Sequence, residues 1–520
     1  MSPSATRQRP VARLRSRLGG ARRPLAGDRA ATALARGALP AVVVAGSVLR
    51  CWGLGRQGLW YDEAVTSWLL RGTPRQLLAA LPHSESTPPL YYLVAWGWVR
   101  AVGDTAAGLR ALSALAGTAT IAVAFAAGRS LAGRRVGLVA AILVAVNPLL
   151  VWYSQEARSY ALLVLVTATS LWLCARVLAR PQRRRLLAWA GASAIALATH
   201  YFAVFAVAPQ AVVVLAQRRA ALRDRLLAVG LVGLAGASLL VLALAQRKHR
   251  YWFIGRPVAF RTEQIVRQFL VGFRPPATRP AELVAASAVA VGGVALALRG
   301  SRRERRAAAV AGGVGLAAVA LPLALALAGT DLVNTRNVIG ALVPLAVAVA
   351  CGLGARRARV AGSVATVVLV GVSLWALVAL ARDPLGQRPR WGAVAAALGP
   401  ARAPRLILLE GTSTWARPLS LLLPHTWWLG RRGASVREVD VVRRPGRRRC
   451  PEATWWGPFC DLRPSPALIA PGRGMRLVWR RDVAGFEVAC FRSQRPVRFT
   501  QRFSRHRRLL LTPTRQPLVP

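Results

Sequence analysis

The stretch ALSALAGTATIAVAFAAGRSLAGRRVGLVAAILVAVNPLLVWY, residues 111–153, decides the fold. Two long apolar runs flank a short arginine-rich connector, GRSLAGRR at 128–135. An apolar run of about 20 residues crosses the ~30 Å hydrocarbon core as a helix, whereas barrel strands alternate over about ten residues. Connectors rich in arginine stay in the cytoplasm. The stretch therefore predicts a helical hairpin in a membrane, with its turn on the cytoplasmic side.

The same alternation of apolar runs and arginine-rich connectors recurs along the 520 residues. The chain is 54% hydrophobic with a mean hydropathy of +0.38, which excludes an ordinary soluble protein. We expect eleven spans, near 31–51, 107–127, 136–153, 160–178, 186–200, 201–217, 226–245, 281–298, 307–328, 337–355 and 359–381. With the N-terminus inside, five arginine-rich connectors fall in the cytoplasm, at 128–135, 180–185, 217–225, 299–306 and 355–359. The other connectors fall outside, at 52–106, 154–159, around 200, 246–280 and 329–336.

The strong positive charge of the chain follows the same pattern. There are 72 Lys and Arg against 19 Asp and Glu. Such a chain could bind nucleic acid, but its arginines cluster between apolar runs, where they set the orientation in the membrane. No nucleic-acid partner is therefore expected. Residues 1–30 are predicted to form a cytoplasmic tail, because they lack the apolar core and cleavage site of a signal peptide.

The apolar segment PPLYYLVAWGWVRAVG, residues 88–103, is predicted not to cross the membrane. A helix of this length rises only about 24 Å, and counting it as a span would move the later arginine-rich connectors outside. We expect a re-entrant or interfacial helix instead. Residues 31–381 are thus predicted to form an all-α polytopic membrane domain with a large first outside loop, 52–106.

Beyond residue 381 the apolar content falls, and residues 382–520 are predicted to form a small extracytoplasmic α/β domain. Outside the cytoplasm, Cys450 and Cys460 would be able to form a disulfide. Strands are expected at 405–411, 475–483 and 486–491, with a helix near 393–398 and a loose segment from residue 495.

Two adjacent carboxylates stand in the first outside loop, in LWYDEAVT at 59–66. Trp60 and Tyr61 are expected to lie in the membrane interface and to hold Asp62 and Glu63 at the bilayer edge. A partly desolvated carboxylate has a raised pKa and is a better general base, and adjacent acids can also bind a divalent cation. The alternative is a pair of ordinary solvated loop acids.

A second cluster, ESTPPLYY at 85–92, follows in the same loop. The Pro-Pro pair fixes the chain direction where the chain re-enters the interface, which would bring Glu85 and Tyr91 to membrane depth. The alternative is a plain helix start with proline in the first turn.

The third cluster, YSQEARSY at 153–160, is a very short connector between two strong spans. Arginine is suited to bidentate contact with phosphate. Arg158 is therefore a candidate phosphate ligand, and Gln155, Glu156 and Tyr160 are candidate neighbours of the substrate. The alternative is an ordinary polar hairpin between spans.

Two smaller features complete the set. His200 and Tyr201 lie in the middle of a long apolar stretch, where polar residues are often functional, although a lone histidine can also be a satisfied core residue. DLVNTRN, 331–337, opens the tenth span. There Arg336 is either a phosphate ligand at the membrane surface or a snorkelling anchor.

These features are all predicted on one outer face, and they offer carboxylates for base or metal chemistry and arginines for phosphate. Such a set suits attack on a lipid-linked phosphate, because an arginine can neutralise the leaving phosphate while a carboxylate deprotonates the acceptor hydroxyl. The predicted substrate-binding residues are Glu85, Tyr91, Gln155, Glu156, Arg158, Tyr160, His200, Tyr201 and Arg336. Candidate ligands for a divalent cation are Asp62, Glu85 and His200.

The motifs LWYDEA, ESTPPLYYL, NPLLVWYSQEARSYALL, THYFA and NTRNVIGALVP resemble, in that order, the GT-C superfamily of membrane glycosyltransferases. The similarity is to the glycosyltransferase family 39-like integral membrane proteins of actinobacteria, relatives of protein O-mannosyltransferases and of the lipid A aminoarabinose transferase. It covers roughly residues 40–400. DPLGQRPRWGAVAAAL, residues 383–398, looks like the start of these proteins' outside domain.

The resemblance implies a hexosyltransferase that moves a sugar, with inversion, from a polyprenyl-phosphate donor to a glycan, lipid or protein acceptor outside the cytoplasm. It implies that Asp62 and Glu63 carry catalysis. Where many relatives have His or Lys before Pro-Pro, this chain has Thr87. The alternative is a transporter or flippase of lipid-linked sugars, which more often shows matched halves and ionisable groups at mid-bilayer; no matched halves are evident here.

Overall fold

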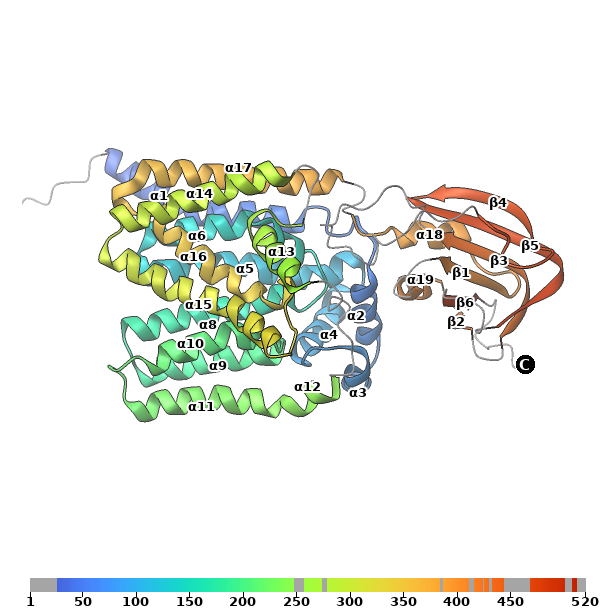
Figure 1. The fold of residues 1–520 in the computed structure, drawn as a ribbon, viewed down its shortest axis with the longest axis horizontal. Coiled ribbons are helices and arrows are strands. Elements are labelled where there is room, and N and C mark those ends of the chain that lie inside the picture. The colour runs from blue at the N-terminus through green and yellow to red at the C-terminus, as the bar shows by residue number, and fades with distance from the viewer. Residues whose placement is uncertain are drawn as a thin grey trace, which may run out of the picture.

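The computed structural model describes residues 26–246, 257–273, 278–383, 387–410, 416–423, 425–429, 433–443, 468–500 and 507–511. It contains a bundle of long helices and, at one end of this bundle, a domain built on a β-sheet (Figure 1). Cys450 and Cys460, the predicted disulfide pair, lie outside the described residues.

Each of the eleven predicted spans contains a helix. By length and composition, six described helices could cross a membrane, or seven if the bent pair α6–α7 is one span, so the count of eleven stays a prediction. The bundle helices are α1 (Ala26–Cys51), α5 (Ala106–Ala132), α6 (Arg134–Val146), α7 (Pro148–Ser154), α8 (Tyr160–Ala179), α9 (Arg183–Thr199), α10 (Ala203–Leu215), α11 (Leu222–Ser238), α12 (Leu240–Gln246), α13 (Val258–Val271), α14 (Thr278–Arg299), α15 (Arg302–Leu327), α16 (Leu342–Leu353) and α17 (Arg359–Arg382).

A 60° bend between α6 and α7 shapes the end of the bundle that faces the sheet. Pro148 has no backbone N–H to continue the helix. Asn147 caps the new helix, because its Oδ1 accepts the Leu150 N–H at 3.1 Å, while its amide donates to the Phe269 carbonyl at 2.9 Å. The bend redirects the chain into the loop at 155–159.

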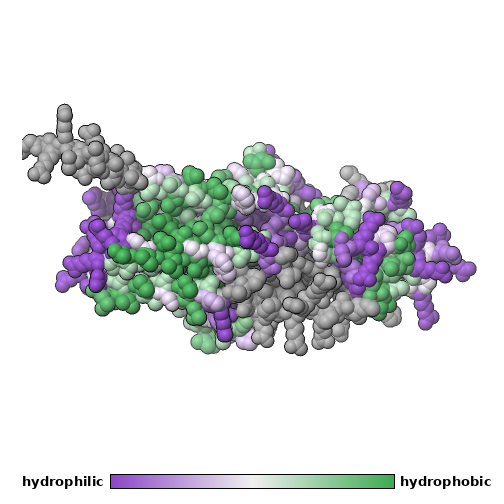
Figure 2. Space-filling model, turned by 90° about the horizontal axis from the view of Figure 1, so that it is seen from above, coloured by the Kyte–Doolittle hydropathy of each residue, from purple (hydrophilic) through white to green (hydrophobic). Residues whose placement is uncertain are grey.

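At the far end of the bundle, the arginine-rich connectors meet one another. Arg303 donates to the Leu131 carbonyl at 3.0 Å, and Arg135 donates to the Arg359 carbonyl at 3.2 Å. Three of the five predicted cytoplasmic connectors are thereby brought together. Figure 2 shows hydrophilic side chains at this end and an apolar belt over the bundle. The pattern is that of a protein with one basic end and a lipid-facing middle.

The segment predicted as the first outside loop forms three short helices at the end of the bundle near the sheet domain, α2 (Tyr61–Arg71), α3 (Pro74–Ser84) and α4 (Leu90–Val102) (Figure 1). The predicted re-entrant or interfacial segment is α4, which has 13 residues. Its Trp96 and Trp98 donate to the backbone carbonyls of Gly72 and Gly108, so both indoles are fixed against neighbouring turns.

The C-terminal domain contains a six-stranded sheet in the order β2-β6-β1-β3-β5-β4. One face packs on α18 (Trp391–Leu398) and α19 (Ala416–Leu422). The prediction of a loose segment from residue 495 is wrong, because β5 continues to Phe499 and β6 pairs antiparallel with β1 and β2. The strands are β1 (Arg405–Glu410), β2 (Thr426–Trp428), β3 (Ala434–Arg443), β4 (Arg476–Val483), β5 (Phe486–Phe499) and β6 (Arg507–Leu511).

Candidate active site at the end of the helix bundle

Glu63, in the first turn of α2, is a structural residue in this geometry. Its carboxylate accepts two hydrogen bonds from Arg110, at 2.7 and 2.6 Å, and one from the backbone N–H of Ala157 at 2.9 Å. Burial acts to raise the pKa of Glu63, but Arg388 and Arg110 outweigh it and hold this pKa below its usual value. The carboxylate is fully buried and its oxygens are occupied, which speaks against the predicted catalytic role for Glu63.

Asp62, the other member of the pair, is differently placed. Its side chain is 20% exposed, and the guanidinium of Arg336 lies 3.5 Å from its Oδ2. Arg336 belongs to η2 (Thr335–Asn337), where the Asn334 side chain accepts the Arg336 N–H. Its guanidinium also lies 6.0 Å from the ring centre of Tyr160. The structure therefore brings two predicted residues, 274 positions apart in the chain, into one partly open ion pair.

Arg158, predicted to bind phosphate, is already held by protein groups. Glu85 pairs with it through both oxygens, at 2.8 and 2.9 Å, and the Tyr92 hydroxyl lies 3.0 Å away. Tyr91 is buried and packs edge-on against Tyr92 with ring centres 5.2 Å apart. The predicted cluster at 85–92 thus does meet the loop at 155–159, but in this arrangement Arg158 positions Glu85 and does not present its guanidinium to a ligand.

Glu156 lies beside this pair, and its pKa is raised. Burial raises the pKa of Glu156 to about 7, while Arg388 opposes the rise and Glu63 and Asp62 add to it. Its Oε2 lies 3.3 Å from an Arg388 nitrogen, and its buried Oε1 has no hydrogen-bond partner among the described residues. A buried carboxyl with a pKa near neutrality is suited to exchange a proton.

The remaining predicted residues lie around this centre or apart from it. The Gln155 side chain donates to the Leu49 and Trp52 carbonyls at the end of α1, so it supports the loop. Tyr160 lies between Tyr153 and His200, with ring centres 4.8 and 5.7 Å away. The hydroxyl of Tyr201 donates to Gln246 of α12 at 2.9 Å; this contact belongs to the packing of α12 and not to the charged centre.

The three candidate metal ligands do not form a metal site. Both oxygens of Glu85 face Arg158, and Asp62 faces Arg336. The Nδ1 of His200 accepts the Phe202 N–H at 3.2 Å. In the part of the chain that the structure describes, the one group of three such ligands within 4.8 Å of one another is in the C-terminal sheet.

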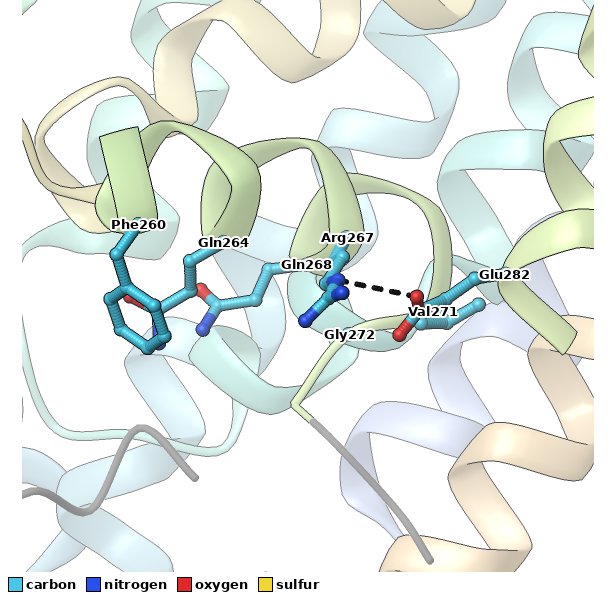
Figure 3. A pocket seen from close by; sticks show the side chains of 7 residues that line it. All are labelled: Phe260, Gln264, Arg267, Gln268, Val271, Gly272 and Glu282. Carbon is cyan, nitrogen blue, oxygen red and sulfur yellow. Dashed lines mark ion pairs between the residues drawn. The ribbon is translucent and has the colours of Figure 1, made fainter. Parts of the chain in front are cut away.

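A hollow of about 360 Å³ lies along α13, lined by Phe260, Gln264, Arg267, Gln268, Val271, Gly272 and Glu282 (Figure 3). Its one arginine, Arg267, is paired with Glu282 at 3.2 Å and with Glu263 at 2.5 Å. A guanidinium between two carboxylates is a poor partner for another anion, so this hollow is less suited to phosphate than the region around Arg336.

Sequence reasoning missed the two arginines that organise the centre. Arg110 is a lone cation near the start of an apolar helix, α5, and such a residue usually has a buried partner. Arg388 lies in the segment 383–398 and reaches Glu156 across 232 positions of sequence. Arg110 was detectable in the sequence as a charge in an apolar run, whereas nothing in the sequence around Arg388 indicated its contact with Glu156.

Comparison with known proteins bears on the family and the fold of the chain. Residues 86–245 match the family described as dolichyl-phosphate-mannose-protein mannosyltransferase. No curated protein matches the chain by sequence. The chain is similar to the structure of ArnT from Cupriavidus metallidurans bound to undecaprenyl phosphate, with 14% identity, a TM-score of 0.52, and coverage of 88% of this chain and 98% of that chain. The Archaeoglobus fulgidus oligosaccharyltransferase in complex with Zn and sulfate gives 12% identity and a TM-score of 0.39, over 69% of this chain and 55% of that chain.

The family match and the shared fold confirm the resemblance to the GT-C superfamily of membrane glycosyltransferases. At 14% identity the likeness to ArnT concerns the fold, and it extends over nearly the whole chain. The family match covers α4 to α12 and so includes the loop at 155–159, while Asp62, Arg336 and Arg388 lie outside it.

Proposed function

We propose that the protein is a glycosyltransferase that moves a sugar from a polyprenyl-phosphate donor to an acceptor hydroxyl on the outer side of the cytoplasmic membrane. The observation that carries the proposal is the partly exposed pair of Asp62 and Arg336 at the bundle end opposite the arginine-rich connectors. A catalytic carboxylate and a phosphate-binding guanidinium are the two groups that this transfer needs.

The charges of the centre are balanced among its own residues. Four acids, Asp62, Glu63, Glu85 and Glu156, meet four arginines, Arg110, Arg158, Arg336 and Arg388. A donor phosphate that enters this poorly solvated place therefore has to draw one arginine away from its carboxylate.

Arg336 is the arginine best placed to receive the phosphate. Its side chain is 15% exposed, against 1% for Arg110, 8% for Arg158 and 3% for Arg388. Its 3.5 Å approach to Asp62 is also looser than the hydrogen-bonded contacts of the other three. A donor phosphate that attracts Arg336 would weaken this pair and leave Asp62 available.

Asp62 then acts as the general base towards the acceptor hydroxyl. As the acceptor oxygen attacks the anomeric carbon, its proton passes to the Asp62 carboxylate and the bond from the sugar to phosphate breaks. The departing phosphate keeps the bonding electrons, and Arg336 stabilises its added charge. Attack from the face opposite the phosphate inverts the anomeric centre, and the released lipid phosphate stays in the bilayer.

The test is transfer by the purified protein in lipid, with radiolabelled polyprenyl-phosphate sugars and crude envelope acceptors. We expect Asp62→Asn to lower the rate by about 10²- to 10⁴-fold, the usual contribution of a general base, while donor binding persists. The matched control is Asp104→Asn, which breaks an exposed pair with Arg71 in the same loop region, 54% exposed on both sides.

The possible outcomes distinguish failure of the proposed function from failure of the assignment of Asp62 as the base. Failure of the wild-type protein to consume any such donor would refute glycosyl transfer, and movement of an intact donor between leaflets would favour a flippase. Full activity of Asp62→Asn alongside an active wild type would refute Asp62 as the base only.

A further inference from the structure

The described linker residues 387–390, which precede α18, lie against the candidate active site. Arg388 of this linker is 4% exposed. One of its nitrogens donates to the Gln155 carbonyl at 2.7 Å, and the other lies 3.3 Å from Glu156 Oε2. A side chain from outside the membrane domain therefore forms part of the buried wall of the centre.

Two further groups lie close to this guanidinium. It is 4.7 Å from the ring centre of Trp152, and its Nε is 3.9 Å from Glu63 Oε2. Stacking on an aromatic face combined with two directional contacts holds arginine more tightly than charge alone would. Lysine cannot make the same contacts, since its ammonium group lacks the planar, two-pronged arrangement of N–H donors of a guanidinium.

The linker is anchored on both sides of Arg388. The Arg388 N–H donates to the Gln57 side chain at 3.2 Å, and Gln57 also pairs with Gln387. On the other side, Trp391 is buried and packs on Phe486 of the sheet, with ring centres 4.7 Å apart. Gly58 allows the close approach, because a Cβ there would lie 2.7 Å from the Pro389 carbonyl oxygen.

We propose that Arg388 is a positioning residue through which the linker to the C-terminal domain completes the active site, holding Glu156 and its loop in the geometry and charge state that transfer requires. The inference rests on the proposed glycosyl transfer. It gives the C-terminal domain a function at the site: the sheet core fixes Trp391, and Trp391 fixes the linker three residues after Arg388.

The charged groups around Glu156 lie on α2, on the loop of Glu156 itself and on the linker. Arg388 and Arg158 lower its pKa, whereas Glu63 and Asp62 raise it together with burial. Tyr153 and Tyr160 lie on the helices on either side of the loop. Removal of Arg388 deletes the largest attractive charge in this set, so the carboxyl of Glu156 should hold its proton to a higher pH.

The experiment measures transfer against pH, with the purified full-length protein in lipid, for wild type, Arg388→Gln and Arg388→Lys. The matched control is Arg390→Gln, since Arg390 is exposed and lies two residues further along the same linker. We expect Arg388→Gln to move the acidic limb of kcat/KM upward by about one pH unit, so that its activity loss approaches about tenfold near pH 6 and shrinks at alkaline pH. The activity loss of Arg388→Lys should lie between those of wild type and Arg388→Gln, and the pH profile of Arg390→Gln should match that of wild type.

A double-mutant cycle with Glu156→Gln gives a second readout that a merely structural role would not move. If Arg388 acts through Glu156, Arg388→Gln should cost much less in the Glu156→Gln background than in wild type. Equal losses in both backgrounds, or a uniform loss with no shift of the acidic limb, would overturn the proposal. If Arg388→Gln does not fold, the same two criteria apply to Arg388→Lys. An inactive wild type would instead refute the proposed function itself.

Discussion

Two clusters of arginines and carboxylates, one at the end of the helix bundle and one in the C-terminal sheet, differ in which of their charged groups reach solvent. In the sheet, the Arg405 guanidinium lies 3.1 Å from Asp440 and 3.4 Å from Glu438. Arg405 also donates to the Leu398 and Gly399 carbonyls at the end of α18. The helix end therefore covers Arg405 and Asp440, and the sheet cluster reaches solvent at Glu438 and Arg492, whereas the bundle cluster opens at Asp62 and Arg336.

The comparison shows that a perturbed carboxyl does not by itself locate an active site. Burial raises the pKa of Asp440 to about 6 and that of Glu156 to about 7. Asp440, Glu438 and Cys490 even stand within metal-ligand distance of one another, but Arg405 and Arg492 already balance the two carboxylates. What distinguishes the bundle cluster is the number of separate segments that meet in it, namely α2, the loop at 155–159, η2 and the linker at Arg388.

The largest expected effect is the loss of stability caused by substitution of Glu63, which would disrupt the bundle cluster. Glu63→Gln leaves Arg110 and Arg388 buried without their shared counter-charge, which costs about 3–5 kcal/mol. We expect a sharp fall in the yield of folded protein, and a lower Tm for whatever is recovered in detergent. Size-exclusion chromatography and a thermal scan by tryptophan fluorescence measure both.

The matched control is Glu438→Gln in the sheet cluster. Glu438 is 23% exposed and its partner Arg492 is 61% exposed, so water replaces the lost contact and the cost should stay within about 1 kcal/mol. Wild-type stability in Glu63→Gln would show that the bundle cluster is looser than its geometry indicates, and that Glu63 remains available for catalysis.

The contrast between Asp62 and Glu63 also shows what could be predicted from the sequence and what could not. Apolar run length and arginine spacing predicted a helix in each of the eleven expected spans, because both are local features, but they did not predict α13, which lies in the connector 246–280. Which of two adjacent acids faces inward depends on the rotation of α2 and on Arg110, 47 positions away. Likewise, Arg158 looked free in the sequence, and only the fold brings Glu85 to it from 73 positions away.

An intermediate effect is expected at Arg336, where the bundle cluster opens. Arg336→Gln removes one charge-assisted contact to the donor phosphate, worth about 1.5–3 kcal/mol, so KM for the donor should rise roughly ten- to a hundredfold. Arg71→Gln is the control, because Arg71 forms the exposed pair with Asp104 outside the centre. Initial rates measured against donor concentration give this KM. An unchanged KM in Arg336→Gln would show that another arginine binds the donor phosphate.

The smallest effect is expected in the sheet cluster, at Asp440. The folded pKa of Asp440 is about 6, above the ordinary value of 3.8, so between pH 4 and 6 the unfolded chain releases a proton that the folded chain keeps. Stability must therefore fall as pH rises through this range, by an amount of about 3 kcal/mol for a shift of about two units. Asp440→Asn removes this dependence, and because the pKa of about 6 already includes the attraction to Arg405, the mutant should gain a few degrees in Tm at pH 7. Thermal scans of the full-length protein from pH 4 to 7 measure the difference, with the exposed Asp482→Asn as control. A difference that does not grow with pH would mean that Asp440 is ionised throughout, and the sheet cluster would then hold its charges as openly as Asp62 and Arg336 do.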